Sequence, residues 1–598
     1  MFHRNTPLLP LPLAATAIAV IAALSGCNRA ADAPKSASAP GYDLLIRNGT
    51  VYDGSGGEPR VADVAISGDR IVAIDKDISG SAKREIDASG MAVSPGFINV
   101  LSWANESLLE DGRAQSDLRQ GVTLEIFGEG SSMGPWNARM QAQYAEGNKS
   151  GASWSTLGEY LDVLAARGIA PNVASFVGAA TVRRYVLGED DVTPDAAQLA
   201  QMQGLVRDAM QEGALGVGSS LIYVPATFAK TDELTALAQV AGQCGGMYIT
   251  HMRSETDHIL EAVDETIAIA RDSGAPAEIY HLKIGGKANW DKLDPVVARI
   301  DAARASGVRI TTDMYPYPAS ATGLDASMPP WVREGGYDAW AKRLRDPAVR
   351  KRVIAEMRAP TNDWENLFRA VGGPQNMLLV AFRNPALQPL VGKTLAEVAQ
   401  MRGTSAEETA MDLVIEDGTR VGVAYFGMSE DNQKRQMKLP YMSFGSDGPA
   451  ITAEGENLKS NPHPRAYGTF ARILGHYVRD EKVLTLTEAI HRMTSLPAQH
   501  LSLRERGLLQ AGYMADVVVF DPATIQDHST FEDPHHYATG VSTVVVNGVV
   551  ALDKGEPTGA ASGRVVRGRG WSGWQDGGCR AAPSDWTWAD PAAGKPAT

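Results

Sequence analysis

Short apolar runs alternate with amphipathic segments over most of this chain. The runs that we interpret as buried strands cover residues 98–100, 123–127, 173–176, 215–219, 247–250, 278–280, 309–312 and 441–444. Segments with the apolar spacing of helices, such as 196–212 and 231–244, separate most of them. Strands that alternate with helices in this way predict a parallel α/β fold, the (β/α)8 barrel (TIM barrel).

The two ends of the chain have a different pattern, in which short β-like runs alternate with turns. Asn48-Gly49 carries the chemistry of a hairpin turn, and apolar runs return at 515–520 and 541–546. Neither end holds enough strands for a core of its own. We therefore expect a small β-sandwich built from residues 42–94 and 491–568, around a barrel at 95–490. The long gap after Pro316 predicts an insertion at about 323–435, and residues 569–598 an irregular tail.

The N-terminus has the features of a secretory signal. Arg4 precedes an apolar run at 8–24, which ends in Leu24-Ser25-Gly26-Cys27. This ending resembles a bacterial lipobox, so we expect residues 1–27 to be a lipoprotein signal peptide, with Cys27 lipidated. Residues 28–41 would be a flexible tether. The protein would then be periplasmic and held to the membrane, with Asn28 favouring the outer membrane. An uncleaved membrane anchor is the alternative.

Only two further cysteines exist, Cys244 and Cys579. They could pair in an oxidising periplasm, but they lie far apart in the sequence and nothing supports a contact. We expect Cys244 to be a buried apolar residue and Cys579 to sit in the tail.

Composition adds two limits. An apolar content of 44% among 598 residues can support a large core. A net charge of −14, without a basic stripe, argues against nucleic acid as a partner.

Polar residues that follow the predicted strands are candidates for chemistry. His251 and His281 each end an apolar run, and Asp447 follows a later run in Gly445-Ser446-Asp447-Gly448. The carboxyl ends of barrel strands are where catalytic groups gather. These three residues therefore point to a metal-dependent hydrolase.

Seven short motifs, in order, resemble one known family. They are Pro95-Gly96-Phe97-Ile98, Gly121-Val122-Thr123, Thr250-His251-Met252-Arg253-Ser254-Glu255, His281-Leu282-Lys283, Asp313-Met314-Tyr315-Pro316-Tyr317, Gly445-Ser446-Asp447-Gly448 and Pro462-His463-Pro464-Arg465. Their order and spacing resemble the N-acyl-D-amino-acid deacylase (D-aminoacylase) branch of the amidohydrolase superfamily, from Tyr42 to about Arg567.

The chain departs from that family on its first two strands. The family's first strand ends Pro-Gly-Phe-Ile-Asp-x-His-x-His, but Leu101 and Trp103 stand at the histidine positions here. One of the family's two metal positions should therefore be absent. On the second strand Glu129 falls at the family's cysteine ligand, if one deletion is allowed. We predict one divalent metal held by Glu129, His251 and His281, with Glu125 as a substitute for Glu129.

Three protein ligands with an open fourth position are the catalytic zinc pattern. Zinc is expected, although manganese, iron or cobalt stays open. The alternative reading of Glu129 is a turn carboxylate that caps backbone amides.

The resemblance also implies roles for other residues. Asp447 would act as general base and then general acid, and Arg465 would bind the substrate's carboxylate. The family's substrate-contacting tyrosine and serine correspond to Tyr315 or Tyr317 with Ser320. Lys283 could act on the leaving group or pair with Glu129. Arg253 and Glu255 could form an ion pair, and His463 could line the mouth of the site.

The function expected is hydrolysis of a C–N amide bond in a small N-acylated amino acid, or a related amide. A second hypothesis is a cyclic amide or an ester as substrate, with Leu101 and Trp103 lining an apolar acyl pocket. A third is a catalytically inactive binding lipoprotein. The sequence does not specify the acyl group, the side chain, the stereochemistry or the oligomeric state.

Overall fold

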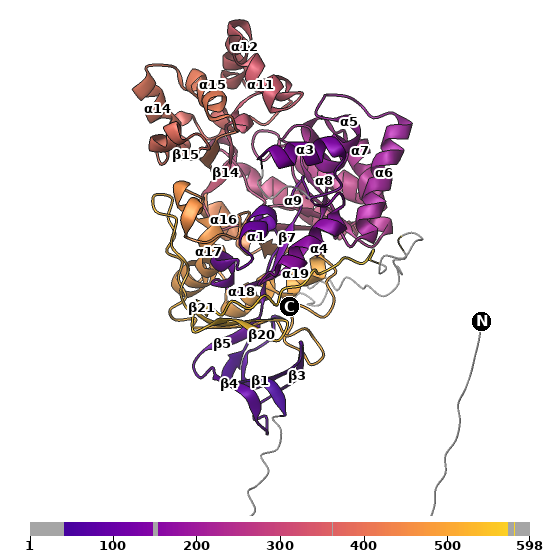
Figure 1. Cartoon of the computed structure of the whole chain (residues 1–598), viewed down its shortest axis with the longest axis vertical. Coiled ribbons are helices and arrows are strands. Elements are labelled where there is room, and N and C mark those ends of the chain that lie inside the picture. The colour runs from indigo at the N-terminus through magenta and orange to yellow at the C-terminus, as the bar shows by residue number, and fades with distance from the viewer. Residues whose placement is uncertain (1–40, 148–152, 361–362, 572–578, 580–598) are drawn as a thin grey trace, which may run out of the picture.

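The computed structural model describes residues 41–147, 153–360, 363–571 and 579. A barrel occupies its middle, between a β-domain at one end and a helical lobe at the other (Figure 1). The predicted signal peptide, the lipidation site Cys27 and all of the tether but Gly41 lie outside the described residues. Within the described part, no helix is long and apolar enough to cross a membrane.

The barrel consists of parallel strands in two arcs. One arc is β6 (Phe97–Asn99), β7 (Val122–Phe127) and β8 (Asn172–Ser175); the other is β9 (Val177–Gly178), β10 (Gly216–Ser220), β11 (Met247–His251), β12 (Ala277–Ile279), β13 (Ile310–Met314) and β17 (Met442–Phe444). Backbone hydrogen bonds join the arcs, from Leu215 N to Ser175 O on one side and from Asp447 N to Leu101 O on the other. The predicted α/β barrel is confirmed, and β8 and β9 together fill one strand position.

Helices connect the strands and cover the barrel. They are α1 (Ala104–Glu110), α2 (Gln115–Leu118), α3 (Ala138–Gly147), α4 (Leu157–Arg167), α5 (Ala179–Leu187), α6 (Ala196–Gln211), α7 (Thr231–Gln243), α8 (Ile259–Ser273), α9 (Leu293–Ala305), α16 (Glu430–Met437), α17 (Arg465–Arg472), α18 (Leu486–Met493) and α19 (Ser495–His500). Asp195 and Gln198 form a capping box that starts α6. The two helices predicted at 196–212 and 231–244 are α6 and α7.

The predicted insertion is a lobe with its own sheet and core. Its antiparallel strands are β14 (Ala319–Gly323), β16 (Gly422–Phe426) and β15 (Met377–Ala381), in that spatial order. Its helices are α10 (Pro330–Arg333), α11 (Tyr337–Arg343), α12 (Pro347–Arg358), α13 (Leu367–Ala370), α14 (Leu395–Arg402) and α15 (Ala406–Asp417). They pack around buried residues such as Met357, Leu379 and Val414. Figure 1 shows this lobe at the end of the molecule opposite the β-domain.

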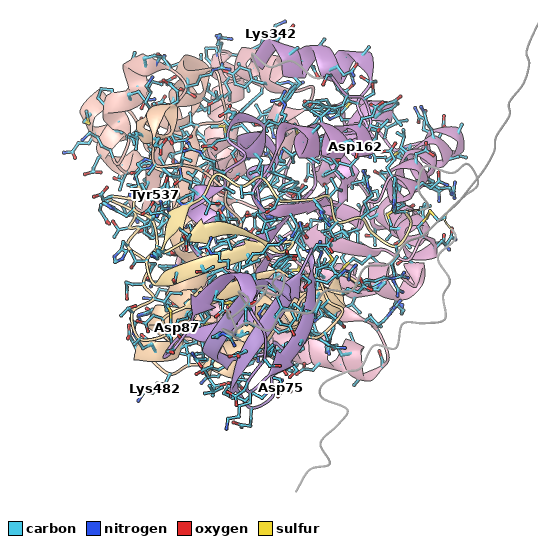
Figure 2. The ribbon with its side chains drawn as sticks, turned by 60° about the horizontal axis from the view of Figure 1, so that its bottom comes forward. Asp75, Asp87, Asp162, Lys342, Lys482 and Tyr537 are labelled. Carbon is cyan, nitrogen blue, oxygen red and sulfur yellow. A yellow bond between two sulfur atoms is a disulfide. The ribbon has the colours of Figure 1, made fainter. Side chains whose placement is uncertain are left out.

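Both chain ends build the β-domain, as expected. Its strands are β1 (Tyr42–Val51), β2 (Arg60–Ser67), β3 (Arg70–Asp75), β4 (Ala82–Asp87), β5 (Ala92–Pro95), β18 (Val517–Phe520), β19 (Val541–Val546), β20 (Val549–Asp553) and β21 (Glu556–Pro557). Hydrogen bonds connect all of them in one nine-stranded sheet, and the antiparallel pair β5–β18 joins the two ends. In Figure 2 this domain comes forward, with Asp75 and Asp87 marking its N-terminal strands. Lys342 of the lobe lies at the top of the same view.

The expectation for the two cysteines is wrong in one respect. Cys244 is buried as predicted, but it forms a disulfide with Cys579 across 335 residues. After β21 the chain runs along the barrel, with hydrogen bonds from Val566 N to Val173 O and from Gly568 N to Gly213 O. This path carries the tail to the end of α7, where Cys244 lies. Side chains hold it as well, since Arg564 pairs with Asp69 and Arg567 with Asp162. The sequence has no pattern that signals such a return, because all of these partners lie hundreds of residues away.

Candidate active site

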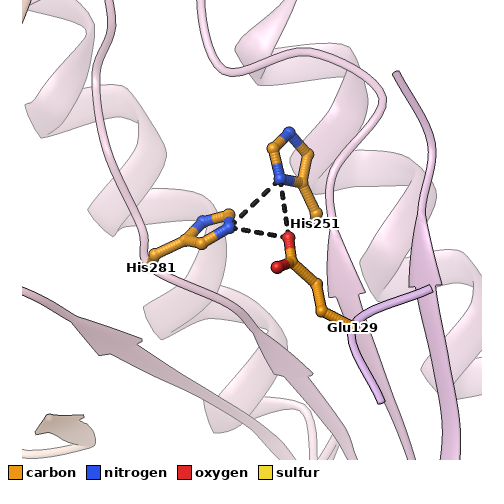
Figure 3. Close-up of side chains that lie close together, drawn as sticks. All are labelled: Glu129, His251 and His281. Atoms are coloured by element: carbon orange, nitrogen blue, oxygen red, sulfur yellow. Dashed lines mark hydrogen bonds and ion pairs between the residues drawn. The ribbon is translucent and has the colours of Figure 1, made fainter. Parts of the chain in front are cut away.

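Three predicted ligands converge at the carboxyl ends of three barrel strands. Glu129 follows β7, His251 ends β11 and His281 follows β12, and all three are buried. Glu129 Oε1 lies 3.0 Å from both His251 Nδ1 and His281 Nε2, and these two nitrogens are 3.1 Å apart. Figure 3 shows the three side chains pointing toward one another.

This arrangement fits a zinc ion. Zinc bonds of about 2.0–2.1 Å at tetrahedral angles place neighbouring ligand atoms about 3.4 Å apart, slightly more than the spacing seen here. Two imidazoles and one carboxylate are also a donor set that zinc uses in catalytic sites. In the described residues a second grouping of suitable side chains, Glu430, His476 and Glu481, is largely exposed. The ligand roles of Glu129, His251 and His281 remain predictions that the geometry supports.

Glu255 lies behind both histidines. The sequence analysis did not assign this role to Glu255. Its carboxylate is 3.1 Å from His281 Nδ1, 3.5 Å from His251 Nε2 and 2.7 Å from Lys283 Nζ. Lys283 therefore does not pair with Glu129, and its Nζ also lies 2.7 Å from His281 Nδ1. Arg253 pairs with Glu265 rather than with Glu255. The position of Glu255, four residues after His251, was the available signal, because carboxylates commonly orient metal-binding histidines.

The electrostatics keep this cluster charged. Burial would raise the pKa of Glu129, but hydrogen bonds from His251 and His281 hold it well below its ordinary value. Burial and Lys283 would lower the pKa of His281, yet Glu255 and Glu129 raise it to about 10. In the absence of a metal, a proton on His281 offsets part of the negative charge of the carboxylates. A divalent cation bound in the cluster would supply positive charge instead.

The turn at His281 is held by its neighbour on β13. His281 has a φ of 35°, a left-handed conformation that is uncommon for residues other than glycine. Its backbone nitrogen donates to Asp313 Oδ1 at 2.9 Å, and the next nitrogen, of Leu282, donates to Asp313 O at 2.8 Å. Asp313 thus fixes the direction in which the imidazole enters the site.

Asp447 lies beside the cluster on the loop after β17. Its φ of 51° is tolerated because aspartate enters the left-handed region more readily than most residues. Ser446 N donates to the buried Asn99 side chain at 2.7 Å, which ties this loop to the first strand. Asp447 Oδ2 is 2.6 Å from Arg465 Nη1. Burial raises the pKa of Asp447, and the guanidinium opposes this shift.

The two residues that stand at the family's histidine positions have different surroundings. Leu101 is fully buried in the barrel and does not line the cavity, so an acyl pocket formed by both residues is not observed. Trp103 does line the cavity. Its Nε1 donates to Glu129 Oε2 at 3.1 Å and to Asp447 Oδ1 at 3.0 Å.

Glu125, the substitute ligand, lies outside the cluster. Its carboxylate accepts from Asn99 Nδ2 at 2.9 Å, inside the barrel. Burial raises its pKa to about 7, with opposing hydrogen bonds from Ser102 and Asn99. The structure therefore places Glu129, and not Glu125, with the histidines.

A cavity of about 530 Å³ opens above the cluster. Lys283, Tyr315, Ser320 and Arg465 line it, as expected for substrate contacts. Tyr317 is not among the lining residues. Its hydroxyl lies 3.5 Å from Pro464 O, so its predicted substrate role has no support.

His463 also lies outside the lining residues. It is buried, with Nε2 2.9 Å from Ala319 O at the start of β14.

The insertion supplies the outer wall of this cavity, including residues that sequence reasoning did not single out. Asp325 pairs with both Arg333 and Arg420, at 3.0 and 2.8 Å. Arg420 is half exposed and lies over the ring of Tyr223, which in turn contacts the ring of His251. Two guanidinium groups on one carboxylate leave this wall with a net positive charge.

A (β/α)8 barrel with this cluster and an adjacent carboxylate defines a metal-dependent hydrolase. Residues 84–552 match the amidohydrolase family (Amidohydro_3). The chain belongs to that family, and it is a hydrolase acting on non-peptide C–N bonds.

Similar proteins include two enzymes of Alcaligenes xylosoxydans xylosoxydans. A D-aminoacylase is 33% identical over 88% of this chain and 97% of its own length, and an N-acyl-D-glutamate deacylase is 32% identical over 88% and 96%. The solved N-acyl-D-glutamate deacylase of Bordetella bronchiseptica, complexed with zinc and a phosphonate inhibitor, has a TM-score of 0.74 and 31% identity, covering 88% of this chain and 99% of that one. A D-aminoacylase with a binuclear metal centre, described by one-metal activation and second-metal attenuation, has a TM-score of 0.73 and 34% identity, with coverage of 88% and 100%.

Proposed function

We propose that this protein is a mononuclear, zinc-dependent N-acyl-D-amino-acid deacylase. The observation that carries the proposal is the convergence of Glu129, His251 and His281 on one point, beside the buried carboxylate of Asp447. Similarity to D-aminoacylase and N-acyl-D-glutamate deacylase over 88% of the chain supports the substrate class.

The residues divide the chemistry among them. A zinc ion held by the cluster supplies a Lewis acid that lowers the pKa of water and polarises a carbonyl. Asp447 accepts the proton of the attacking water and delivers it to the departing nitrogen, which would otherwise be a very poor leaving group. Glu255 and Lys283 hold His281 in place from behind.

Two arginines on the cavity wall favour an anionic substrate. Arg465 faces the site from the start of α17, and Arg420 adds a cation on the outer wall. A guanidinium binds a carboxylate through two parallel hydrogen bonds, so either arginine suits the free carboxylate of an N-acyl amino acid. A neutral cyclic amide would leave both cations without an anionic partner from the substrate. The two arginines therefore support an N-acyl amino acid, rather than a cyclic amide or an ester, as the substrate.

We further propose that the protein is a periplasmic lipoprotein, anchored through Cys27. Three cysteines are present; one stands in the lipobox-like sequence and the other two form the Cys244–Cys579 disulfide. Structural disulfides persist in oxidising compartments and are rare in the bacterial cytosol. We expect the mature protein to begin at Cys27 with acyl chains attached, as measured by mass spectrometry of its N-terminal peptide. An N-terminus that retains residues 1–26, or a Cys27 without lipid, would contradict the lipid anchor.

The metal content and hydrolysis by matched variants test the catalytic proposal. We expect one zinc per purified chain, lost in Glu129→Gln and retained in Glu125→Gln, a control on the same strand outside the cluster. N-acetyl-D-amino acids should be hydrolysed faster than their L enantiomers, as measured by amine release. Two metals per chain, or zinc retained in Glu129→Gln, would contradict the site.

The other hypotheses predict different results. Turnover of neutral cyclic amides or esters, but of no N-acyl amino acid, would establish the second hypothesis. Absence of bound metal after reconstitution with zinc, together with absence of hydrolysis, would establish the binding lipoprotein.

A further inference from the structure

A single indole N–H lies between the two carboxylates of the site. Trp103 Nε1 is 3.1 Å from Glu129 Oε2 and 3.0 Å from Asp447 Oδ1. An indole nitrogen can only donate a hydrogen bond, and it cannot bind a metal. The two carboxylates therefore share one hydrogen, in a bifurcated arrangement.

Backbone contacts hold the indole in this position. Trp103 N donates to Gly448 O at 2.9 Å, and Asp447 N donates to Leu101 O at 2.8 Å. The first strand and the Asp447 loop are thus joined on both sides of Trp103. On the other flank, Ser102 N donates to Ile126 O at 2.8 Å, in the strand that leads to Glu129. The backbone that carries the indole is consequently fixed relative to both carboxylates, although the side chain itself is 38% exposed.

Two carboxylate oxygens that face a common point would otherwise attract a cation. Hard divalent ions bind such oxygen pairs, and like charges held close together in a buried site are costly without a counter-charge. We propose that the Trp103 N–H takes the place of a second metal ion. It positions Asp447 and Glu129 for the reaction, and it restricts the centre to one metal.

This assignment gives Trp103 a positioning role rather than a role in acyl binding. The D-aminoacylase with a binuclear centre is described as attenuated by its second metal. With the indole in place, we expect excess zinc to leave this protein active, because the position between the carboxylates is closed. Both halves of the inference rest on the proposed zinc cluster, and the positioning half rests on the proposed activity as well.

Metal binding tests exclusion without any substrate. We expect protein carrying His476→Gln, which removes the exposed grouping of Glu430, His476 and Glu481, to bind one zinc at every concentration up to a hundredfold excess, by elemental analysis after gel filtration and by titration calorimetry. In the same background Trp103→His, which replaces the indole N–H with an imidazole that can bind a metal, should bind a second zinc. A second zinc without the Trp103 change, or one zinc only in the Trp103→His protein with unchanged melting behaviour, would overturn exclusion.

Kinetics test positioning. Trp103→Phe keeps an aromatic ring and removes the N–H, so in assays at one zinc per chain we expect kcat to fall at least tenfold with KM nearly unchanged. Trp331→Phe is the matched control, because Trp331 Nε1 also donates to a carboxylate, Glu356 at 2.8 Å, outside the cavity. Its kcat should not change. An unchanged kcat in Trp103→Phe, or an effect confined to KM, would overturn the positioning role. If no N-acyl amino acid is turned over by the wild type, the proposed function fails while the zinc counts still decide exclusion.

Discussion

Removal of the Cys244–Cys579 disulfide should destabilise the fold without changing the chemistry. The bond closes a loop of 335 residues. In the chain-entropy description, a cross-link over a loop of that length lowers the free energy of folding by about 6 kcal/mol at 25 °C, because the unfolded chain loses that much freedom. Hydrogen bonds that dock the tail, such as Gly568 N to Gly213 O, remain in the reduced protein. The free energy calculated from the loop length is therefore an upper limit for the stability that is lost with the disulfide.

Denaturant unfolding of the wild type and of Cys244→Ser/Cys579→Ser measures this effect. We expect the unfolding midpoint to fall in the double variant, and to fall equally in the wild type after reduction. The kcat should be unchanged, since the bond lies at the end of α7 and not among the cavity residues. Equal midpoints for oxidised wild type and double variant would refute the reasoning. So would two titratable thiols at Cys244 and Cys579 in unreduced, denatured protein.

Three further changes test other parts of the site. Asp447→Asn should lower kcat by about 10²–10⁴-fold with zinc retained, because it removes the general base and not a ligand; metal analysis beside kinetics checks both. Arg465→Lys should raise KM roughly tenfold, since lysine keeps the charge and loses the planar fork; an unchanged KM would refute a carboxylate contact. Burial raises the pKa of Glu125 to about 7, so ionisation of this carboxyl group opposes folding. The free energy of unfolding should therefore fall by about 3 kcal/mol between pH 4.5 and pH 7 because of this group. Glu125→Gln should remove that fall, as measured by unfolding titrations at several pH values.

Much of the fold could be predicted because it depends on local patterns. The apolar runs before His251 and His281 are barrel strands, and the helical spacing at 196–212 and 231–244 marks helices. The position of Glu129 near both histidines was implied instead by the family resemblance, in which Glu129 falls at the cysteine ligand.

Features that depend on distant contacts could not be predicted. The disulfide requires the tail to return to α7. The N–H of Trp103 donates a hydrogen bond to Asp447, which lies 344 residues later in the sequence. Leu101 and Trp103 were treated as equivalent apolar substitutions. In an extended segment residues two apart point to the same side, but Trp103 is the residue before α1 and its backbone, with φ −102° and ψ 26°, has left the extended conformation. The role of Glu255 was missed because its charge alone suggested a pair with its neighbour Arg253.

The separate core of the insertion has a consequence for how this enzyme could diversify. Arg333 and Arg420 reach the cavity from a lobe that packs around its own buried residues, whereas the metal cluster belongs to the barrel. Sequence changes in the lobe can therefore reshape the outer wall without disturbing the ligands. Part of the substrate-contacting surface is thus encoded apart from the metal cluster, so we expect exchange of residues 319–426 between relatives to shift substrate preference while leaving the ligands in place.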